Sequence, residues 1–284
     1  MKLLRYGPLG LERPAVLDAG GVMRDISSVI EDLNPRCLSR VDIVAKLKSA
    51  DTKAFPVVAS AARLGPCVDP VGKIICIGYN SRLHAEEMAS KPATGGEMPV
   101  FFKPSSAACG ANDPIIYSRF AGKLDWEAEL GVVIGKKGKY IGKSAALAHI
   151  LGYTCFNDVS DRYWQFEKDD KQYTKGKGFD SFAPIGPYLV TKDEVADAGD
   201  LDVKLWVNGQ LRQDFNTSDY INSAEDVVSY LSRFFTLYPG DVIAMGSAPG
   251  NARSWGEDKF LKPGDRVRLE IESLGVQEQT VTKE

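Results

Sequence analysis

The chain has 284 residues and a mass of 31.0 kDa, so it is long enough to bury a sizeable core. Hydrophobic residues make up 44% of it, as in ordinary soluble globular proteins. With 35 Lys and Arg against 38 Asp and Glu, the formal net charge of -3 offers no basic footprint for a nucleic acid, which we exclude as a partner.

Glycine and proline interrupt residues 1–14 before any long apolar stretch develops. Neither a signal peptide nor a membrane-spanning helix is predicted there, and we expect a cytoplasmic protein with no membrane contact. The five cysteines are odd in number, widely spaced and form no Cys-x-x-Cys pair, which favours reduced thiols.

The first 34 residues predict a β-rich start, because short apolar runs follow one another with a glycine turn between the last two. These runs are residues 2–6, 14–18 and 22–26. After them, Ser39 can cap a short amphipathic helix with Val41 and Val44 on its apolar stripe.

Turn formers in residues 64–72 indicate a linker. We therefore predict a small β-rich N-terminal domain over residues 1–68 and a larger domain over residues 69–284. Strands are expected at residues 73–80, 130–134, 201–207, 241–245 and 267–271. Helices are expected at residues 143–151 and 223–235, the second beginning at a Ser-x-x-Asp capping box. Without alternating strand–helix units, a dinucleotide fingerprint or a phosphate loop, the fold class is α+β and β-dominated.

Two glutamates, Glu127 and Glu129, alternate with small or apolar residues where an apolar strand begins. If strand geometry starts at Glu127, both carboxylates point to the same face. Such a pair would repel by about 4 kcal/mol at ~4 Å in an effective dielectric of ~20, so it needs a cation or a proton. Oxygen ligands alone favour Mg²⁺, Mn²⁺ or Ca²⁺ over zinc. From this segment by itself, a solvated strand edge is the alternative.

Asp158 follows a second apolar run and can supply a third carboxylate; a helix cap or a turn is its alternative role. Further on, Lys175 and Lys177 lie among glycines that let the backbone approach a ligand closely. One of them can bind a substrate carboxylate or stabilise an enolate, whereas the alternative is a solvated basic loop.

The chain has two histidines. His149 lies in an apolar helical stretch and is interpreted as structural. His84 follows a predicted strand, and helical spacing places Glu87 one turn away. A carboxylate beside an imidazole raises its basicity, as a general base requires, although a surface ion pair is the alternative.

These residues together resemble the fumarylacetoacetate hydrolase family, over most of residues 71–274. The motifs that carry the resemblance are Gly78-x-Asn80 with His84 and Glu87, Lys103-Pro104-Ser105-Ser106, Glu127-x-Glu129-Leu130, Asn157-Asp158-Val159-Ser160, Arg162 with Gln165, Gly176-Lys177-Gly178-Phe179-Asp180, Pro184-Ile185-Gly186-Pro187, and Pro239-Gly240-Asp241-Val242-Ile243. Residues 1–63 resemble the small N-terminal domain of some members.

The resemblance implies a mixed β-roll catalytic domain, commonly a homodimer, with Mg²⁺ or Mn²⁺ on Glu127, Glu129 and Asp158. It also implies that Lys177 contacts the substrate and that His84 and Glu87 lie on a mobile lid. In the family's hydrolases the metal chelates the dicarbonyl end of an acylpyruvate, and the His–Glu pair activates water. Carbon–carbon cleavage then releases an enolate that metal and lysine stabilise.

For substrate binding we predict five side chains from the motifs and their surroundings: Arg82, Lys103, Arg162, Gln165 and Ser247. Two departures from the family pattern affect the pocket: Ser81 and Leu83 replace a frequent tyrosine and aspartate, and Gly246-Ser247-Ala248-Pro249-Gly250 replaces the common Gly-Thr-Pro-x-Gly. Arg82 and Arg253 are extra cations that can recognise a carboxylate, with a surface position as the alternative for each.

We expect a hydrolase acting on a 2,4-diketo acid, because the whole chain is similar to 2,4-diketo-3-deoxy-sugar-acid hydrolases, including those for rhamnonate or fuconate derivatives. Pyruvate and a small hydroxy acid would be the products. Ureidoglycolate lyase, oxaloacetate decarboxylase and hydroxymuconate isomerase activities on the same site are the alternatives. A non-catalytic binding protein that keeps the fold is the alternative outside enzymes.

Overall fold

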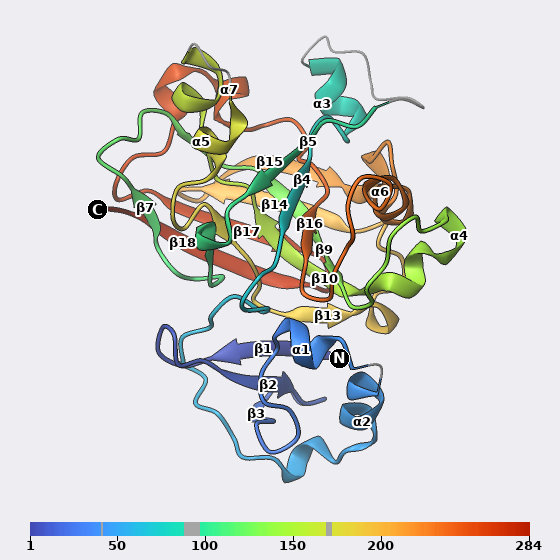
Figure 1. The fold of residues 1–284 in the computed structure, drawn as a ribbon. Coiled ribbons are helices and arrows are strands. Elements are labelled where there is room, and N and C mark those ends of the chain that lie inside the picture. Colours follow the sequence, from blue (N-terminus) through green and yellow to red (C-terminus); the bar gives the residue numbers. More distant parts are fainter. Residues whose placement is uncertain (41, 88–96, 169–171) are drawn as a thin grey trace.

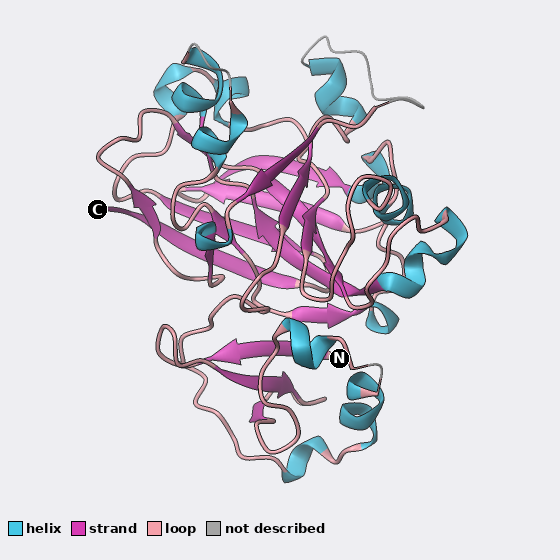
Figure 2. Ribbon diagram, viewed as in Figure 1, coloured by secondary structure: helices cyan, strands magenta, loops and turns pink. Residues whose placement is uncertain are grey.

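The structure is a computed structural model that describes residues 1–40, 42–87, 97–168 and 172–284, except for the side chain of Glu87 (Figure 1). Strands dominate and the helices are short (Figure 2), which confirms the predicted α+β, β-dominated class. None of the helices in the described ranges is long and apolar enough to cross a bilayer. All five cysteines are free thiols, as predicted.

A nine-stranded sheet carries the site and runs through both predicted parts of the chain. In pairing order its strands are β3 (Met23–Asp25), β2 (Arg13–Leu17), β1 (Lys2–Tyr6), β13 (Leu189–Thr191), β10 (Ile150–Asn157), β9 (Ala128–Ile134), β16 (Val242–Ala244), β4 (Ile74–Ile77) and β5 (Val100–Lys103). Strands β9, β16 and β4 are buried at every position, which explains their continuous apolar sequence.

A five-stranded sheet covers the central strands. Its order is β15 (Gln210–Asn216), β14 (Asp202–Val207), β17 (Arg266–Ile271), β18 (Gly275–Lys283) and β7 (Ile115–Tyr117). Along β14 and β17, buried residues alternate with partly or fully exposed ones, so one face packs inward and the other meets solvent. The predicted turn at Asn208 and Gly209 joins β14 to β15 with positive φ at both residues.

Two pairs of very short strands complete the sheets. They are β8 (Leu124–Asp125) with β11 (Ser160–Asp161), and β6 (Ala108–Cys109) with β12 (Ala183–Pro184).

The described α-helices lie at the ends and edges of the sheets (Figure 1). They are α1 (Pro35–Leu38), α2 (Ile43–Ser49), α3 (Arg82–Glu87), α4 (Lys143–Ala146), α5 (Tyr173–Lys177), α6 (Ala224–Leu231) and α7 (Ala252–Trp255). The capping box at Ser223 is confirmed and starts α6. The helix predicted over residues 143–151 is shorter, because a 3₁₀ turn ends it at His149 and Ile150 already pairs with Ile134 in the sheet.

The N-terminal part forms the predicted three-strand β start, with β2 between β1 and β3. The predicted cap at Ser39 is wrong. Ser39 follows the last residue of α1, whose cap is Asn34, and α2 begins four residues later, after Asp42. Val41 lies outside the described residues. Strand β1 pairs with β13 of the larger part, so the two predicted domains share a sheet.

Candidate active site

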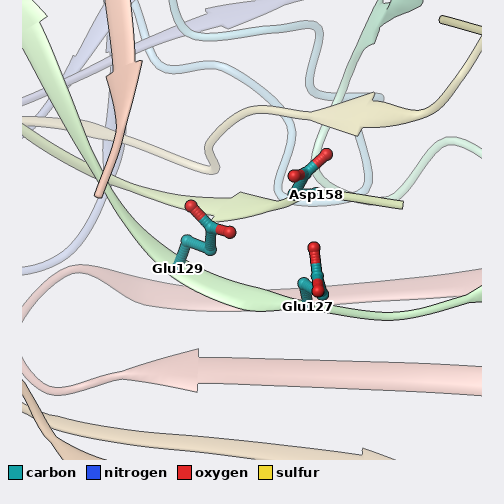
Figure 3. A group of neighbouring side chains, drawn as sticks. All are labelled: Glu127, Glu129 and Asp158. Atoms are coloured by element: carbon teal, nitrogen blue, oxygen red, sulfur yellow. The ribbon is translucent and has the colours of Figure 1, made fainter. Parts of the chain in front are cut away.

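Strands β9 and β10 bring three carboxylates to one point. In their antiparallel register Glu129 lies opposite Phe156, and the backbone N–H of Asp158 donates to the carbonyl of Glu127 at 2.9 Å. Ligand oxygens of Glu127, Glu129 and Asp158 all lie within 4.8 Å of one another. Figure 3 shows these side chains turned toward a common space. Strand β9 begins one residue later than the position assumed from the sequence, yet the alternation keeps both glutamates on one side.

Glu129 carries a buried carboxylate that forms no ion pair with any side chain that the structure describes. It is 2% exposed and accepts one hydrogen bond, at 2.7 Å from the backbone N–H of Gly246. No Lys or Arg among the described residues forms an ion pair with it. Burial first, and then the neighbouring Asp158 and Glu127 carboxylates, raise the pKa of Glu129 well above its usual value. A bound divalent cation would offset this charge.

Glu127 and Asp158, by contrast, share a buried lysine. The Nζ atom of Lys177 lies 2.5 Å from Glu127 and 2.6 Å from Asp158, and Arg162 donates to Glu127 at 2.7 Å. Burial favours protonation of Glu127, but the charges of Arg162 and Lys177 outweigh it and hold the pKa of Glu127 well below its ordinary value. The side chain predicted to contact substrate therefore already lies at the carboxylate cluster.

Arg162 links this cluster to a further buried carboxylate, that of Asp125. Its Nε donates to Asp125 at 2.7 Å, and its Nη1 donates to Gln165 at 2.8 Å. Gln165 is held by a short π-helix, Tyr163–Glu167. Both Arg162 and Gln165 line the cavity, as expected of substrate-binding residues.

The cavity above the carboxylates has a volume of about 70 Å³. Its walls combine aromatic and polar groups. Besides the three carboxylates, Arg162, Gln165 and Lys177, the lining includes Tyr79, His84, Phe101, Phe166, Tyr173, Ser247, Asn251 and Arg253. Helices α3, α5 and α7, which supply part of this lining, lie at the end of the molecule opposite the N-terminal strands, with α5 beside α7 (Figure 1).

His84 reaches the cavity from α3, directly after β4. The Ser81 hydroxyl accepts the backbone N–H of His84 at 3.0 Å and itself donates to Asp219, which anchors the start of the helix. The imidazole stacks on Tyr79, with ring centroids 6.3 Å apart and planes 16° apart. Glu87 ends α3, but its side chain lies outside the described residues, so the His–Glu pair stays a prediction.

Two predicted substrate-binding residues are not brought into the cavity. Lys103 is buried behind Asp158, to which its ammonium donates, and it also donates to the carbonyl of Val159 at 2.9 Å. This places Lys103 as a support for Asp158. Arg82 is exposed on α3 and donates to the carbonyl of Ser218 at 2.9 Å.

The remaining histidine lies outside the cavity, and the remaining predicted serine lies in its lining. His149 contacts the carbonyl of Lys136 at 3.0 Å and is absent from the cavity lining. Ser247 lines the cavity and accepts a hydrogen bond from Gln213 at 2.9 Å.

Sequence reasoning missed the aromatic wall and Asn251. The aromatic residues are Tyr79, Phe101, Phe166 and Tyr173. A signal existed for two of them, because Tyr79 lies two residues after the end of strand β4 and Phe166 directly follows Gln165. Nothing local distinguishes Phe101 and Tyr173 from ordinary core residues, since their rings meet only through the fold, at 5.4 Å.

The fold and the three-carboxylate site define a member of the fumarylacetoacetate hydrolase family. The family model "Fumarylacetoacetate (FAA) hydrolase C-terminal" matches residues 73–282, and the chain belongs to this family. Family and relatives together indicate a hydrolase or a related enzyme.

Among relatives, "Putative hydrolase Bcen2424_5521" of Burkholderia cenocepacia is 47% identical over 280 residues, which cover 98% of each chain. The solved fumarylacetoacetate hydrolase of Exiguobacterium antarcticum is 31% identical over the whole of both chains, with a TM-score of 0.85. Maleylpyruvate hydrolase of Sphingobium sp. SYK-6, solved with manganese(II) and pyruvate, is 27% identical, with a TM-score of 0.82 and coverage of 100% of this chain and 99% of that one.

The donor set of the site fits a hard divalent cation. Three carboxylates are the ligands that Mg²⁺ and Mn²⁺ prefer, and Glu129 in particular is a buried anion that lacks a direct ion-pair partner among the described side chains. The residues present therefore could hold such an ion.

Proposed function

We propose that the protein is a metal-dependent hydrolase that cleaves a carbon–carbon bond of a 2,4-diketo acid of the acylpyruvate type. The observation that carries this proposal is the convergence of Glu127, Glu129 and Asp158 on one buried point, beside Lys177 and in a cavity that His84 also lines. Such a site can bind the oxygen-rich end of a 2-oxo acid and accept negative charge as it develops.

The chemistry divides between the ion and the chain. Mg²⁺ or Mn²⁺, when bound, would supply Lewis acidity toward the 2-oxo carboxylate and the enolate. His84 would accept a proton from the water that attacks the C4 carbonyl. The C3–C4 bond then breaks, its electron pair passes to C3 as the pyruvate enolate, and the acyl part leaves as a carboxylic acid. The ammonium of Lys177 would stabilise the enolate oxygen until C3 is protonated.

The three carboxylates and Lys177 constrain the 2-oxo acid end of the substrate more than its acyl tail. The resemblance of the sequence to 2,4-diketo-3-deoxy-sugar-acid hydrolases, drawn from its motifs, favours a hydroxylated tail, with pyruvate and a small hydroxy acid as products. Sugar-acid derivatives such as those of rhamnonate and fuconate therefore belong in the first assays.

The direct test is a panel of acylpyruvates assayed with Mg²⁺ or Mn²⁺, with pyruvate release followed by a coupled dehydrogenase. We expect turnover that stops when the metal is removed by a chelator. Oxaloacetate and ureidoglycolate are included in the same panel. Absence of pyruvate release from every acylpyruvate would overturn the proposal, and binding without turnover would favour a non-catalytic protein of this fold.

A decarboxylase, lyase or isomerase on the same site is the competing function, because these reactions need enolate stabilisation without an attacking water. The variant His84→Ala separates the cases. Hydrolysis should fall at least about 100-fold, the usual size of a general-base contribution. A reaction that depends chiefly on the metal and Lys177 would keep most of its rate, and that result would count against hydrolysis.

A further inference from the structure

A larger cavity lies on the opposite face of β9 from the three carboxylates. Its volume is about 630 Å³, within the range of cavities that hold small molecules. Leu130 lines it and follows Glu129 on β9, so their side chains point to opposite faces of the sheet. Tyr220 and Met245 also line it, whereas none of the three carboxylates does. This cavity is therefore separate from the candidate active site.

The lining of this cavity carries an excess of negative charge. Four carboxylates belong to it, and lysines outside the lining pair with two of them, Asp193 and Asp226. Asp197 and Glu225 form no ion pair with any side chain that the structure describes. The lining contains one described lysine, Lys192, whose ammonium donates to a backbone carbonyl at 2.6 Å. Two carboxylates thus remain without an ion-pair partner beside a single ammonium.

A buried tyrosine faces these charges. Tyr153 on β10 is 3% exposed and lines the cavity, yet its hydroxyl forms no hydrogen bond with any residue in the described ranges. The hydroxyl is not one of the fully buried atoms that lack a partner, so it opens onto the cavity. Burial, and then the charges of Glu225 and Asp197, raise the pKa of Tyr153 to about 12. Buried polar groups usually have a hydrogen-bond partner, and here the open side is the cavity.

We propose that this cavity binds a small organic cation, an amine with an apolar body, through Glu225, Asp197 and the hydroxyl of Tyr153. An ammonium group has three donors and complements the unpaired negative charge. The apolar body would pack on Leu130 and Met245. A metal ion alone fits less well, because the volume far exceeds that of one ion and the apolar side of the lining offers no oxygen ligands.

The test compares two probes of similar shape, 2-phenylethylamine and 2-phenylethanol, on the full-length protein with Mg²⁺ present. Ligand-observed NMR titration gives both dissociation constants. We expect the amine to bind at least about tenfold more tightly than the alcohol, because its hydrogen bonds to carboxylates are charge-assisted. In Glu225→Gln most of this advantage should disappear. In Tyr153→Phe the amine should bind about fivefold more weakly, as the loss of one hydrogen bond implies.

Thermal unfolding separates a ligand contact from a structural role of Tyr153. Its hydroxyl has no hydrogen-bond partner among the described residues, so Tyr153→Phe should unfold at about the same temperature as wild type. The matched controls are Tyr140→Phe and Glu31→Gln, two exposed positions at which the same changes should leave amine binding unaltered. A clearly lower unfolding temperature of Tyr153→Phe would assign the hydroxyl a structural role and count against the proposal.

Equal binding of the amine and the alcohol to the wild type would overturn the proposal. So would an advantage for the amine that survives in both Tyr153→Phe and Glu225→Gln, or failure of the amine to bind at millimolar concentration. A dimer in light scattering that Glu225→Arg dissociates would assign this surface to a second copy of the chain instead. These results are independent of the acylpyruvate assays, which test the other face of the sheet.

Discussion

Glu129 is buried beside two other carboxylates and accepts one hydrogen bond, from a backbone N–H. Its neighbours Glu127 and Asp158 share the ammonium of Lys177, so their charges are largely offset within the protein. Glu127 and Asp158 thus share a cation, whereas Glu129 has no ion-pair partner among the described residues. Binding of a divalent cation should therefore depend most strongly on Glu129.

We predict that Glu129→Gln lowers the affinity for Mn²⁺ at least about tenfold, since even indirect partners of a metal contribute that much. The metal-free variant should be no less stable than wild type, because the amide keeps the shape of the side chain and removes a repulsive charge. Calorimetric titration with Mn²⁺ and thermal unfolding with chelator measure the two effects. Glu31→Gln, at an exposed site, is the control. Unchanged Mn²⁺ affinity would remove Glu129 from the proposed metal site.

Tyr6 provides a prediction about alkaline pH. Its hydroxyl donates to Asp25, which joins β1 to β3 across β2, and burial together with this hydrogen bond raises the pKa of Tyr6 to about 12. A phenol that holds its proton more strongly in the folded state stabilises the protein below its unfolded pKa of about 10. This contribution is lost as the pH rises from there through the folded value.

The expected result is that wild type is more stable than Tyr6→Phe near neutral pH and that the difference shrinks between about pH 10 and about pH 12. Urea unfolding of both proteins at a series of pH values measures it. A constant difference over the whole range would show that the raised pKa of the Tyr6 hydroxyl contributes nothing to stability.

At the scale of elements, the pairing of β10 with both β9 and β13 holds the site in the sheet. On one side β10 brings Asp158 to Glu127, and on the other its residues Gly152 and Tyr153 pair with β13. A Cβ atom at Gly152 would lie 2.1 Å from the carbonyl oxygen of Val190, which is backbone and cannot rotate away. The close approach of these strands therefore requires glycine.

We predict that Gly152→Ala destabilises the protein by about 1–3 kcal/mol, the usual cost of forcing extra volume into a packed interior. Gly142→Ala is the control, because a Cβ there meets nothing within 4 Å, and its effect should stay below about 1 kcal/mol. Equilibrium unfolding in urea gives both values. Equal effects of the two substitutions would mean that the strands separate without cost.

At the scale of the whole molecule, a single sheet connects the N-terminal strands to the strands that carry the site. Strand β1 lies between β2 and β13, with Leu3 opposite Leu189. The same hydrophobic cluster includes Val16 and Ile26 from the N-terminal part and Val133 from β9. The linker predicted from the turn-rich residues therefore joins two parts that share both backbone pairing and core.

We predict that a chain lacking residues 1–68 aggregates, because its strand β13 would present an unpaired edge and apolar side chains would lose their cover. Light scattering and circular dichroism of the shortened and full-length chains measure this effect. A shortened chain that stays dispersed and unfolds at the same temperature as the full-length protein would show that the larger part is independently stable.

The features that could be predicted from the sequence depend on residues that are close together in the chain. The alternation of Glu127 and Glu129 follows from the two-residue period of a strand, and the capping box at Ser223 follows from three-residue spacing at a helix start. The order of short motifs was enough to indicate the family. The prediction of a helix over residues 143–151 was wrong at its end, because the pairing of Ile150 in the sheet outweighs the local preference for a helix.

The amino-acid sequence by itself indicated the N-terminal strands and several of the central ones, the acidic residues available for a metal and the family. Only the tertiary structure decided which residues from distant segments meet: Lys103 lies behind Asp158 while Lys177 faces it, and Arg82 lies outside the cavity while Arg253 lines it. The physical reason is that strand period and capping act over a few residues. The neighbours of a buried charge depend on strand register and packing between segments far apart in the chain.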